Sequence, residues 1–198
     1  MIREGWFSGR KTRDFTLQWH LTNACPERCR HCYDRSAPAP LGLAQAQDVL
    51  RQLKEFCDHQ DVAGGVCFTG GDPLLYPHFF EVYRATVEAG FDVSILGNPI
   101  PDELLAAICA IRVPRYYQVS LEGCEACNDA IRGVGHYARA LPFLDRLRAH
   151  GVRATVMLTL HRQNLGEAPG LAAALAGRAP CRWSPATWSS SPRATTAA

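Results

Sequence analysis

Three cysteines close together in the sequence, Cys25, Cys29 and Cys32, have the spacing C-x3-C-x2-C. Thiolates are soft, charged ligands that suit iron–sulfur clusters and zinc. Because the next cysteine, Cys57, is distant, three thiolates would hold three irons of a [4Fe–4S] cluster and leave the fourth iron open. A zinc site would need His31, which adjoins Cys32 and would strain a tetrahedral geometry, and a disulfide would leave one cysteine unpaired. The spacing therefore favours an iron–sulfur cluster with one open position.

Tyr33 follows the third cysteine directly, and a C-x3-C-x2-C stretch with an aromatic residue after it resembles the signature of the radical S-adenosylmethionine (radical SAM) superfamily. The resemblance implies that the amino and carboxylate groups of SAM bind the open iron. It also implies that an electron from the cluster cleaves SAM to methionine and a 5′-deoxyadenosyl radical. In that family the aromatic residue lies against the adenine end of SAM, whereas a simpler role for Tyr33 is to pack the loop.

Strands and helices are predicted to alternate along the chain. Residues 16–22 alternate apolar and polar side chains, which is typical of a strand, and residues 41–59 place apolar side chains on one helical face. Further strands are predicted at 65–69, 91–96, 116–121 and 153–160, and further helices at 77–88, 101–111, 137–150 and 165–176. This alternation indicates an α/β fold with parallel strands and helical crossovers. The family resemblance implies a partial (β/α)6 TIM-like barrel, of which about five βα units are predicted here.

Unusual segments follow the carboxyl ends of the predicted strands. They are the cysteine loop and residues 70–73, 97–99, 120–123 and 161–164. In barrel-like α/β folds, active sites form at that rim. The strand pattern by itself therefore predicts a functional site there.

The segment Gly70-Gly71-Asp72-Pro73 resembles the Gly-Gly-Glu-Pro segment of the superfamily, which receives the amino group of SAM. Glycines let the backbone approach a ligand closely, and a carboxylate can accept from an ammonium group. Asp72 is one methylene shorter than the usual glutamate, and the segment alone would be an ordinary turn. Asn98 ends the third predicted strand, where the family often has a polar residue near the SAM ribose or the substrate, although Asn before Pro is also an ordinary turn.

The segments Ser-Leu-Glu-Gly at 120–123 and Ile-Arg-Gly at 131–133 resemble those of peptide-modifying radical SAM maturases. The resemblance implies that Ser120 contacts the SAM ribose region and that Arg132 contacts the SAM carboxylate. It also implies that Glu122, which stands where aspartate is usual, belongs to the SAM-binding residues. Because side chains alternate along a strand, Ser120 and Glu122 should both face inward, which is costly unless the interior holds a polar ligand. The alternative for Arg132 is a solvated surface charge.

The other cysteines and two histidines are expected to have structural roles. Three cysteines fall among apolar residues and should pack as small hydrophobes: Cys57, Cys67 and Cys109. Cys124 and Cys127 form a C-x-x-C pair, which can be a zinc half-site or a redox pair, but incidental cysteines are favoured. His20 and His161 are expected to be satisfied core histidines.

Composition limits the class of protein. The 198-residue chain fits one domain, its apolar content of 47% suffices for a core, and its net charge of +2 gives no signal for a nucleic-acid partner. Residues 1–14 lack the apolar region of a secretory signal, and no apolar run is long enough to span a membrane, so a cytoplasmic protein without a membrane partner is expected. Nine cysteines without an export signal indicate metal or redox chemistry rather than disulfides.

The carboxyl-terminal residues 178–198 differ from the rest of the chain. They contain no Leu, Ile, Val or Phe and are predicted to be disordered. No sixth strand is visible there, although the family resemblance implies six βα units. We therefore expect a radical SAM core at 14–177 and a disordered or frame-shifted tail at 178–198, in a chain truncated after the core.

These features predict a radical SAM enzyme with a [4Fe–4S] cluster and SAM as cofactors and no catalytic residue beyond the cluster ligands. The resemblance is to SPASM-type maturases of ribosomally made peptides, including a thio- or selenooxazole type. It implies a precursor peptide as substrate and an electron donor such as flavodoxin or ferredoxin. The alternatives are a truncated or degenerate iron–sulfur protein that binds a cluster without turnover, and a zinc-stabilised module that uses Cys124 and Cys127.

Overall fold

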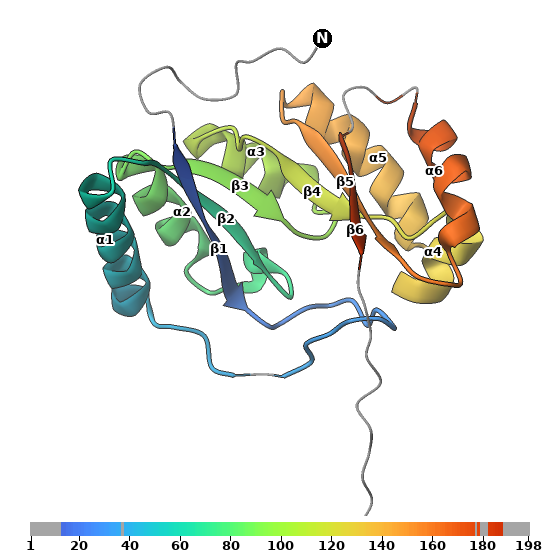
Figure 1. The fold of residues 1–198 in the computed structure, drawn as a ribbon, viewed down its shortest axis with the longest axis horizontal. Coiled ribbons are helices and arrows are strands. Elements are labelled where there is room, and N and C mark those ends of the chain that lie inside the picture. The colour runs from blue at the N-terminus through green and yellow to red at the C-terminus, as the bar shows by residue number, and fades with distance from the viewer. Residues whose placement is uncertain (1–12, 37, 177, 179–181, 188–198) are drawn as a thin grey trace, which may run out of the picture.

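The computed structural model describes residues 13–36, 38–176, 178 and 182–187. In these residues six strands form one sheet in the order β1-β2-β3-β4-β5-β6 (Figure 1). The strands are β1 (Asp14–Thr22), β2 (Ala63–Gly70), β3 (Asp92–Leu96), β4 (Tyr117–Ser120), β5 (Ala154–Leu160) and β6 (Arg182–Thr187). Each strand is parallel to its neighbours, so β1 and β6 are the two edges. The predicted α/β alternation is confirmed.

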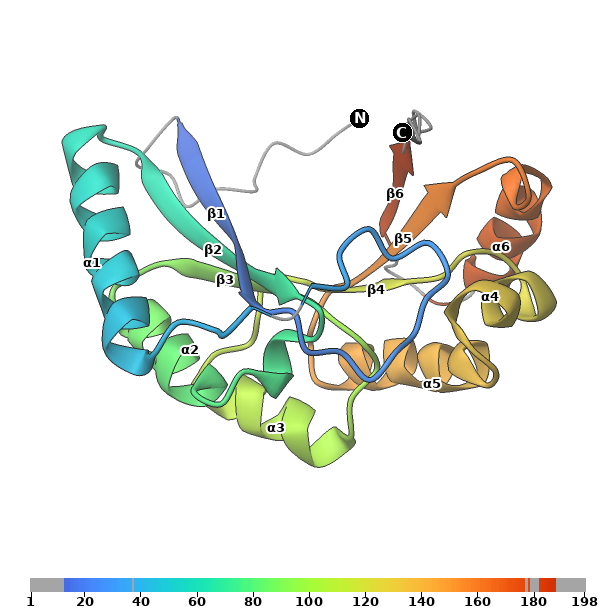
Figure 2. The same ribbon diagram turned by 90° about the horizontal axis from the view of Figure 1, so that it is seen from below.

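Helices connect the strands and lie along one face of the curved sheet (Figures 1 and 2). They are α1 (Leu43–His59), α2 (Phe79–Glu88), α3 (Asp102–Ile111), α4 (Glu125–Arg132), α5 (His136–Ala149) and α6 (Ala168–Leu175), with short 3-10 turns η1 (Pro73–Leu75) and η2 (Leu165–Glu167). Crossovers between parallel strands share one hand, so successive helices fall on the same side when the strands follow chain order. Among the described helices, none has the length and apolar character needed to cross a membrane.

Helix α1 shows how apolar spacing sets the packing. Ala46, Leu50, Leu53 and Cys57 recur every three or four residues, so they form one stripe along the helix, and all four are buried. Burying one such leucine contributes about 2 kcal/mol relative to leaving it exposed. Cys57 therefore has the packing role that its position predicted, and the buried Cys67 of β2 has it too.

Strand β1 shows why the concave face of the sheet is polar. Trp19 and Leu21 belong to the buried core, whereas Gln18 and His20 line a cavity on the opposite face. This follows from the period-two alternation of side chains along a strand. The expectation that His20 is a satisfied core histidine is wrong, because its side chain is exposed toward that cavity.

The five predicted βα units are present, and residues Arg182–Thr187 form β6, a sixth strand where a disordered tail was expected. The strand pairs with β5 along its whole length, so the sheet continues past residue 177. The lack of large aliphatic residues did not exclude a strand here, because an edge strand is held by backbone hydrogen bonds to one neighbour. An edge strand also tolerates a proline such as Pro185. The apparent lack of a sixth strand was the basis of the frame-shift hypothesis, and that basis is removed. Residues 188–198 lie outside the described part of the chain.

His136, the first residue of α5, is buried at the junction of α4 and α5. The side-chain amide nitrogen of Asn128 lies 3.1 Å from Nδ1 of His136. Burial, together with the nearby Arg132 guanidinium, lowers the pKa of His136 from 6.5 to about 4. The folded protein therefore keeps His136 neutral at a pH where the unfolded chain takes up a proton.

The resulting stability is complete above pH 6.5 and is lost as the pH falls toward 4. Between about pH 7.5 and pH 5, we expect the free energy of unfolding to fall by about 1–2 kcal/mol more in the wild-type protein than in a His136→Gln variant. Urea unfolding of both proteins at the two pH values measures the difference. Equal pH dependence in the two proteins would contradict the assignment.

Candidate active site

A cavity of about 410 Å³ opens at the carboxyl ends of the strands, on the concave face of the sheet. Its lining includes Cys25, Cys29, Cys32, Tyr33, Gly70, Gly71, Asn98, Ser120 and Arg132. Each of these residues is predicted from the sequence to bind the cluster or SAM. The structure therefore gathers segments from four strand ends at one place, as the strand pattern predicted. Asp72 and Glu122 are the two predicted site residues that lie outside this lining.

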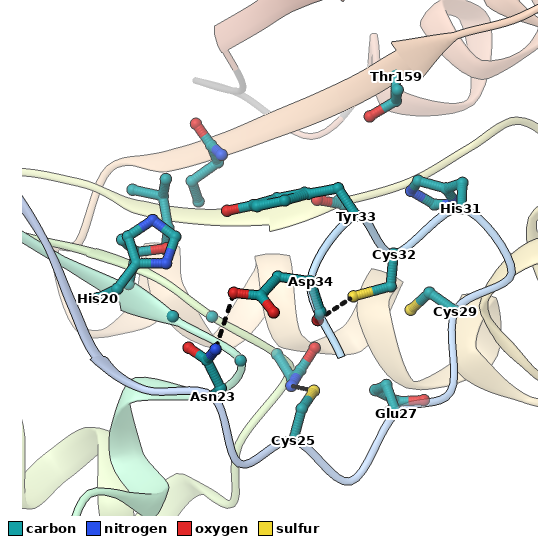
Figure 3. A pocket seen from close by; sticks show the side chains of 18 of the residues that line it. His20, Asn23, Cys25, Glu27, Cys29, His31, Cys32, Tyr33, Asp34 and Thr159 are labelled. Carbon is teal, nitrogen blue, oxygen red and sulfur yellow. Dashed lines mark hydrogen bonds between the residues drawn. The ribbon is translucent and has the colours of Figure 1, made fainter. Parts of the chain in front are cut away.

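The three thiols come from the loop between β1 and α1. Figure 3 shows Cys25, Cys29 and Cys32 with their sulfur atoms facing a shared space. Within the described residues, no three His, Cys, Asp or Glu side chains converge closely enough to hold a single metal ion. A cubane cluster requires no such convergence, because each of its irons takes one thiolate. Three thiols that do not converge on a single point fit a [4Fe–4S] cluster better than a zinc ion, which takes four ligands around one centre.

Polar groups surround the sulfur atoms. The amide nitrogen of Asn98 lies 3.6 Å from Sγ of Cys25, and Nη1 of Arg132 lies 3.7 Å from Sγ of Cys29. Burial raises the pKa of the Cys29 thiol, while the Arg132 guanidinium opposes that rise and Cys25 adds to it. A thiol whose pKa is raised holds its proton more tightly, and metal binding would displace that proton.

The end of β2 lies tightly against the start of the cysteine loop. Backbone N–H groups of Gly71 and Asp72 donate to the carbonyls of Thr22 and Ala24, at 2.7 and 2.8 Å. Gly70 has φ +136°, and a Cβ on it would lie 2.1 Å from the carbonyl oxygen of Thr22. A Cβ on Gly71 would lie 2.4 Å from the carbonyl oxygen of Ala24. Both glycines are thus required by close backbone contact.

Asp72 is buried behind the two glycines. Its carboxylate accepts hydrogen bonds from the backbone N–H of Leu74, at 3.2 Å, and from the side-chain amide of Asn98, at 3.1 Å. The first bond caps η1, and the second fixes the amide that faces Cys25. Burial raises the pKa of Asp72, although these two hydrogen bonds oppose the rise. The carboxylate therefore orients Asn98 in this structure.

Glu122 is fully buried and forms an ion pair with Arg132, whose Nε and Nη2 donate to Oε1 at 2.9 and 2.7 Å. Burial would raise the pKa of Glu122, but contacts with His31 and Arg132 outweigh it, so the pKa is lowered. The Arg132 side chain is only 12% exposed. The alternative that Arg132 is a solvated surface charge is therefore wrong.

Tyr33 stands at the mouth of the cavity with 75% of its surface exposed. Its ring meets the ring of His20 edge-on, with centroids 6.5 Å apart (Figure 3). This exposure argues against a role in packing the loop. It leaves a flat aromatic surface that a planar ligand can contact.

A set of polar contacts that was not predicted from the sequence joins the two ends of the cysteine loop. The side-chain amide of Asn23 donates to Asp34 at 2.8 Å and to the Ser36 hydroxyl at 3.0 Å. Hydrogen bonds from Ser36, then from Asn23, lower the pKa of Asp34. The Asp-x-Ser pattern is typical of a local turn and could have marked these contacts. Cys124 and Cys127 do not line the cavity, in agreement with an incidental role.

Comparison with known proteins places the chain in a family. The model of the radical SAM superfamily matches residues 19–175. The mycofactocin maturase MftC of Mycobacterium ulcerans is 33% identical over 164 residues, which are 79% of this chain and 43% of that protein. The pre-heme d1 synthase of Dinoroseobacter shibae is 29% identical over 160 residues, which are 77% of this chain and 38% of that protein.

The fold also matches solved structures. Streptococcus suis SuiB bound to S-adenosylmethionine has a TM-score of 0.73 at 18% identity, over 92% of this chain and 42% of that one. The chain thus spans about two-fifths of the length of these relatives. Proteins of the matched family use a [4Fe–4S] cluster and SAM. The family match covers most of the chain and includes all three cysteines, so this protein belongs to the radical SAM superfamily.

Proposed function

We propose that this chain is the core of a radical SAM enzyme that modifies a ribosomally made peptide. Cys25, Cys29 and Cys32 would hold a [4Fe–4S] cluster. With SAM bound, such a cluster would supply radical chemistry that removes a hydrogen atom from the substrate. The proposal includes an electron donor such as flavodoxin or ferredoxin. The proposal also includes a reducing, cytoplasmic location, where the thiols of Cys25, Cys29 and Cys32 would stay available to a metal.

The other cavity residues would bind and orient SAM. Gly70 and Gly71 let the backbone approach the amino group of SAM, because neither carries a side chain. Tyr33 offers its exposed ring to the adenine, and Asn98 and Ser120 offer polar groups to the ribose. Glu122 occupies Nε and Nη2 of Arg132, so Nη1 is left for the SAM carboxylate: one of its two N–H groups is directed at Sγ of Cys29, and the other can meet the carboxylate.

The charge of the cavity lining is the observation that favours a peptide over a tetrapyrrole. Among the described residues that line it, Arg132 is the only arginine or lysine, and it is paired with Glu122. The strands contribute neutral hydrogen-bonding side chains, namely Gln18, Thr69, Gln118, Ser120 and Thr159. A substrate with several carboxylates would need matching cations, whereas peptide amides pair with neutral donors and acceptors. One SuiB structure is bound to the precursor peptide SuiA, which agrees with this choice.

A reconstitution assay tests the proposal. The protein is loaded anaerobically with iron and sulfide, reduced with dithionite, and given SAM with either short precursor peptides encoded beside its gene or Fe-coproporphyrin III. We expect 5′-deoxyadenosine in every case, and a mass change in a peptide but not in the tetrapyrrole. Modification of the tetrapyrrole alone would overturn the peptide assignment. A cluster that never yields 5′-deoxyadenosine would instead favour the iron–sulfur protein without turnover.

A further inference from the structure

The carboxylate of Glu122 joins three separate segments of the chain. Glu122 lies two residues after the end of β4, and its side chain is fully buried. Arg132 at the end of α4 donates to Oε1, Nε2 of His31 lies 3.4 Å from the same oxygen, and the backbone N–H of Thr159 in β5 donates to Oε2 at 3.1 Å. A buried carboxylate is costly unless its oxygens are paired, and here both are.

Two of these contacts lead directly to the proposed cluster ligands. His31 lies in the loop between Cys29 and Cys32, so its contact with Glu122 fixes the part of the loop that carries these two thiols. The backbone N–H of Arg30 also donates to the carbonyl of Ile131, at 2.8 Å. The cysteine loop is thus attached to the end of α4 by one backbone bond and to Glu122 by one side chain.

Glu122 also decides which edge of the Arg132 guanidinium faces the sulfur atoms. It binds Nε and Nη2, which leaves Nη1 directed at Sγ of Cys29, 3.7 Å away. Hydrogen bonds to cluster sulfurs and their ligands are among the means by which a protein tunes an iron–sulfur site. A guanidinium without this partner would have no fixed orientation toward Cys29.

The backbone of Glu122 is held as firmly as its side chain. Its N–H donates to the side-chain oxygen of Asn128 at 3.0 Å, and its carbonyl accepts from the side-chain amide of Asn164 at 3.1 Å. These bonds tie the residue to α4 and to the segment after β5. The carboxylate therefore projects from a rigid support, as required of a group that positions others.

We propose that Glu122 is a positioning residue that holds the cysteine loop through His31 and aims Arg132 at Cys29, rather than a residue that contacts SAM. This inference rests on the proposed cluster site. It gives Glu122 a different role from the SAM contact that the family resemblance implies. Its burial outside the cavity lining and its full set of partners support the positioning role.

Iron retention tests this role in a set of matched variants. Glu122→Gln keeps the size of the side chain and removes its charge, and Glu122→Asp keeps the charge but is shorter. Glu167→Gln is the control, because Glu167 accepts a backbone N–H from Cys124 at 3.0 Å without lining the cavity. After anaerobic reconstitution, we expect Glu122→Gln to release iron to a chelator about tenfold faster than wild type. Glu122→Asp should release iron at a rate between those of Glu122→Gln and wild type, and Glu167→Gln should release iron at the wild-type rate.

A double variant separates positioning from general destabilisation. If Glu122 acts through His31, adding His31→Ala to Glu122→Gln should accelerate iron release less than the two single effects combined. Fully additive effects, a wild-type release rate in Glu122→Gln, or an equal effect of Glu167→Gln would each overturn the inference. If Glu122→Gln fails to fold, the His31→Ala variant decides the question, because it leaves the buried ion pair between Glu122 and Arg132 intact. This variant should release iron faster than wild type, and a wild-type rate would overturn the inference.

Thiol labelling keeps this test independent of the proposed function. In the iron-free protein, iodoacetamide should modify Cys29 faster in Glu122→Gln than in wild type, because a loosened loop exposes it. An unchanged labelling rate would contradict the positioning role. Failure of the wild-type protein to take up iron would instead contradict the proposed cluster site, whatever the labelling shows.

Discussion

Cys29→Ala is expected to leave the reconstituted protein with almost no iron and no detectable 5′-deoxyadenosine. Wild type should bind about four irons per chain, the iron content of one [4Fe–4S] cluster. The variant should not, because a cluster held by only three thiolates cannot tolerate the loss of one. Cys25→Ala and Cys32→Ala should behave in the same way, since all three thiols face the same cavity. Iron and sulfide analysis, with ultraviolet–visible spectra, measures the effect.

The control for this experiment is Cys109→Ala. Cys109 lies on α3, partly buried against the core and away from the cavity lining. Its loss removes a small packed side chain, so cluster content per folded chain should remain that of wild type. Wild-type iron content in Cys29→Ala would sink the cluster assignment, because the metal would then have to bind elsewhere.

The strands and helices that were predicted from the sequence are those whose apolar side chains recur with a clear period. Alternation predicted residues 16–22 as a strand, and the structure has β1 at Asp14–Thr22. Helical spacing predicted 41–59, and α1 runs from Leu43 to His59. Side-chain periodicity reports which face is buried, so it is informative wherever one face meets a core.

β6 could not be recognised in this way, since its pairing depends on the backbone of β5 and not on an apolar pattern of its own. The bounds of helix α4 were also not predicted, because the helical spacing after residue 123 is clear only from residue 137. Its eight residues make barely two turns, too few for a clear period. Both elements depend on neighbours that are distant in sequence.

In the candidate site, too, the features set by local sequence were predictable and those set by distant partners were not. The cysteine spacing and the positions after the strands were enough to predict which residues gather at the cavity. They were not enough to predict that Asp72 would bind Asn98 or that Glu122 would bind Arg132, because each partner comes from another element. Family resemblance suggested ligand contacts for both carboxylates. The structure shows them engaged with protein donors.

Gly70→Ala should produce the largest loss of stability of any single methyl addition considered for this chain. Gly70 has φ +136°, where residues with a Cβ are strained, and the added Cβ would lie 2.1 Å from the carbonyl oxygen of Thr22. Backbone must move to relieve such a contact, because no flexible side chain is involved. Strain and overpacking together should lower the free energy of unfolding by about 3 kcal/mol or more. Urea unfolding of the iron-free protein measures this.

Gly166→Ala is the matched control, because no atom lies within 4 Å of a Cβ built on Gly166. Its free energy of unfolding should stay within about 0.5 kcal/mol of wild type. Gly70→Ala should also impair cluster retention in any protein that folds, because the displaced carbonyl of Thr22 also accepts the N–H of Gly71, at the start of the cysteine loop. If Gly70→Ala were as stable as Gly166→Ala, the tight contact between β2 and this loop could not be what holds the cysteines at the cavity.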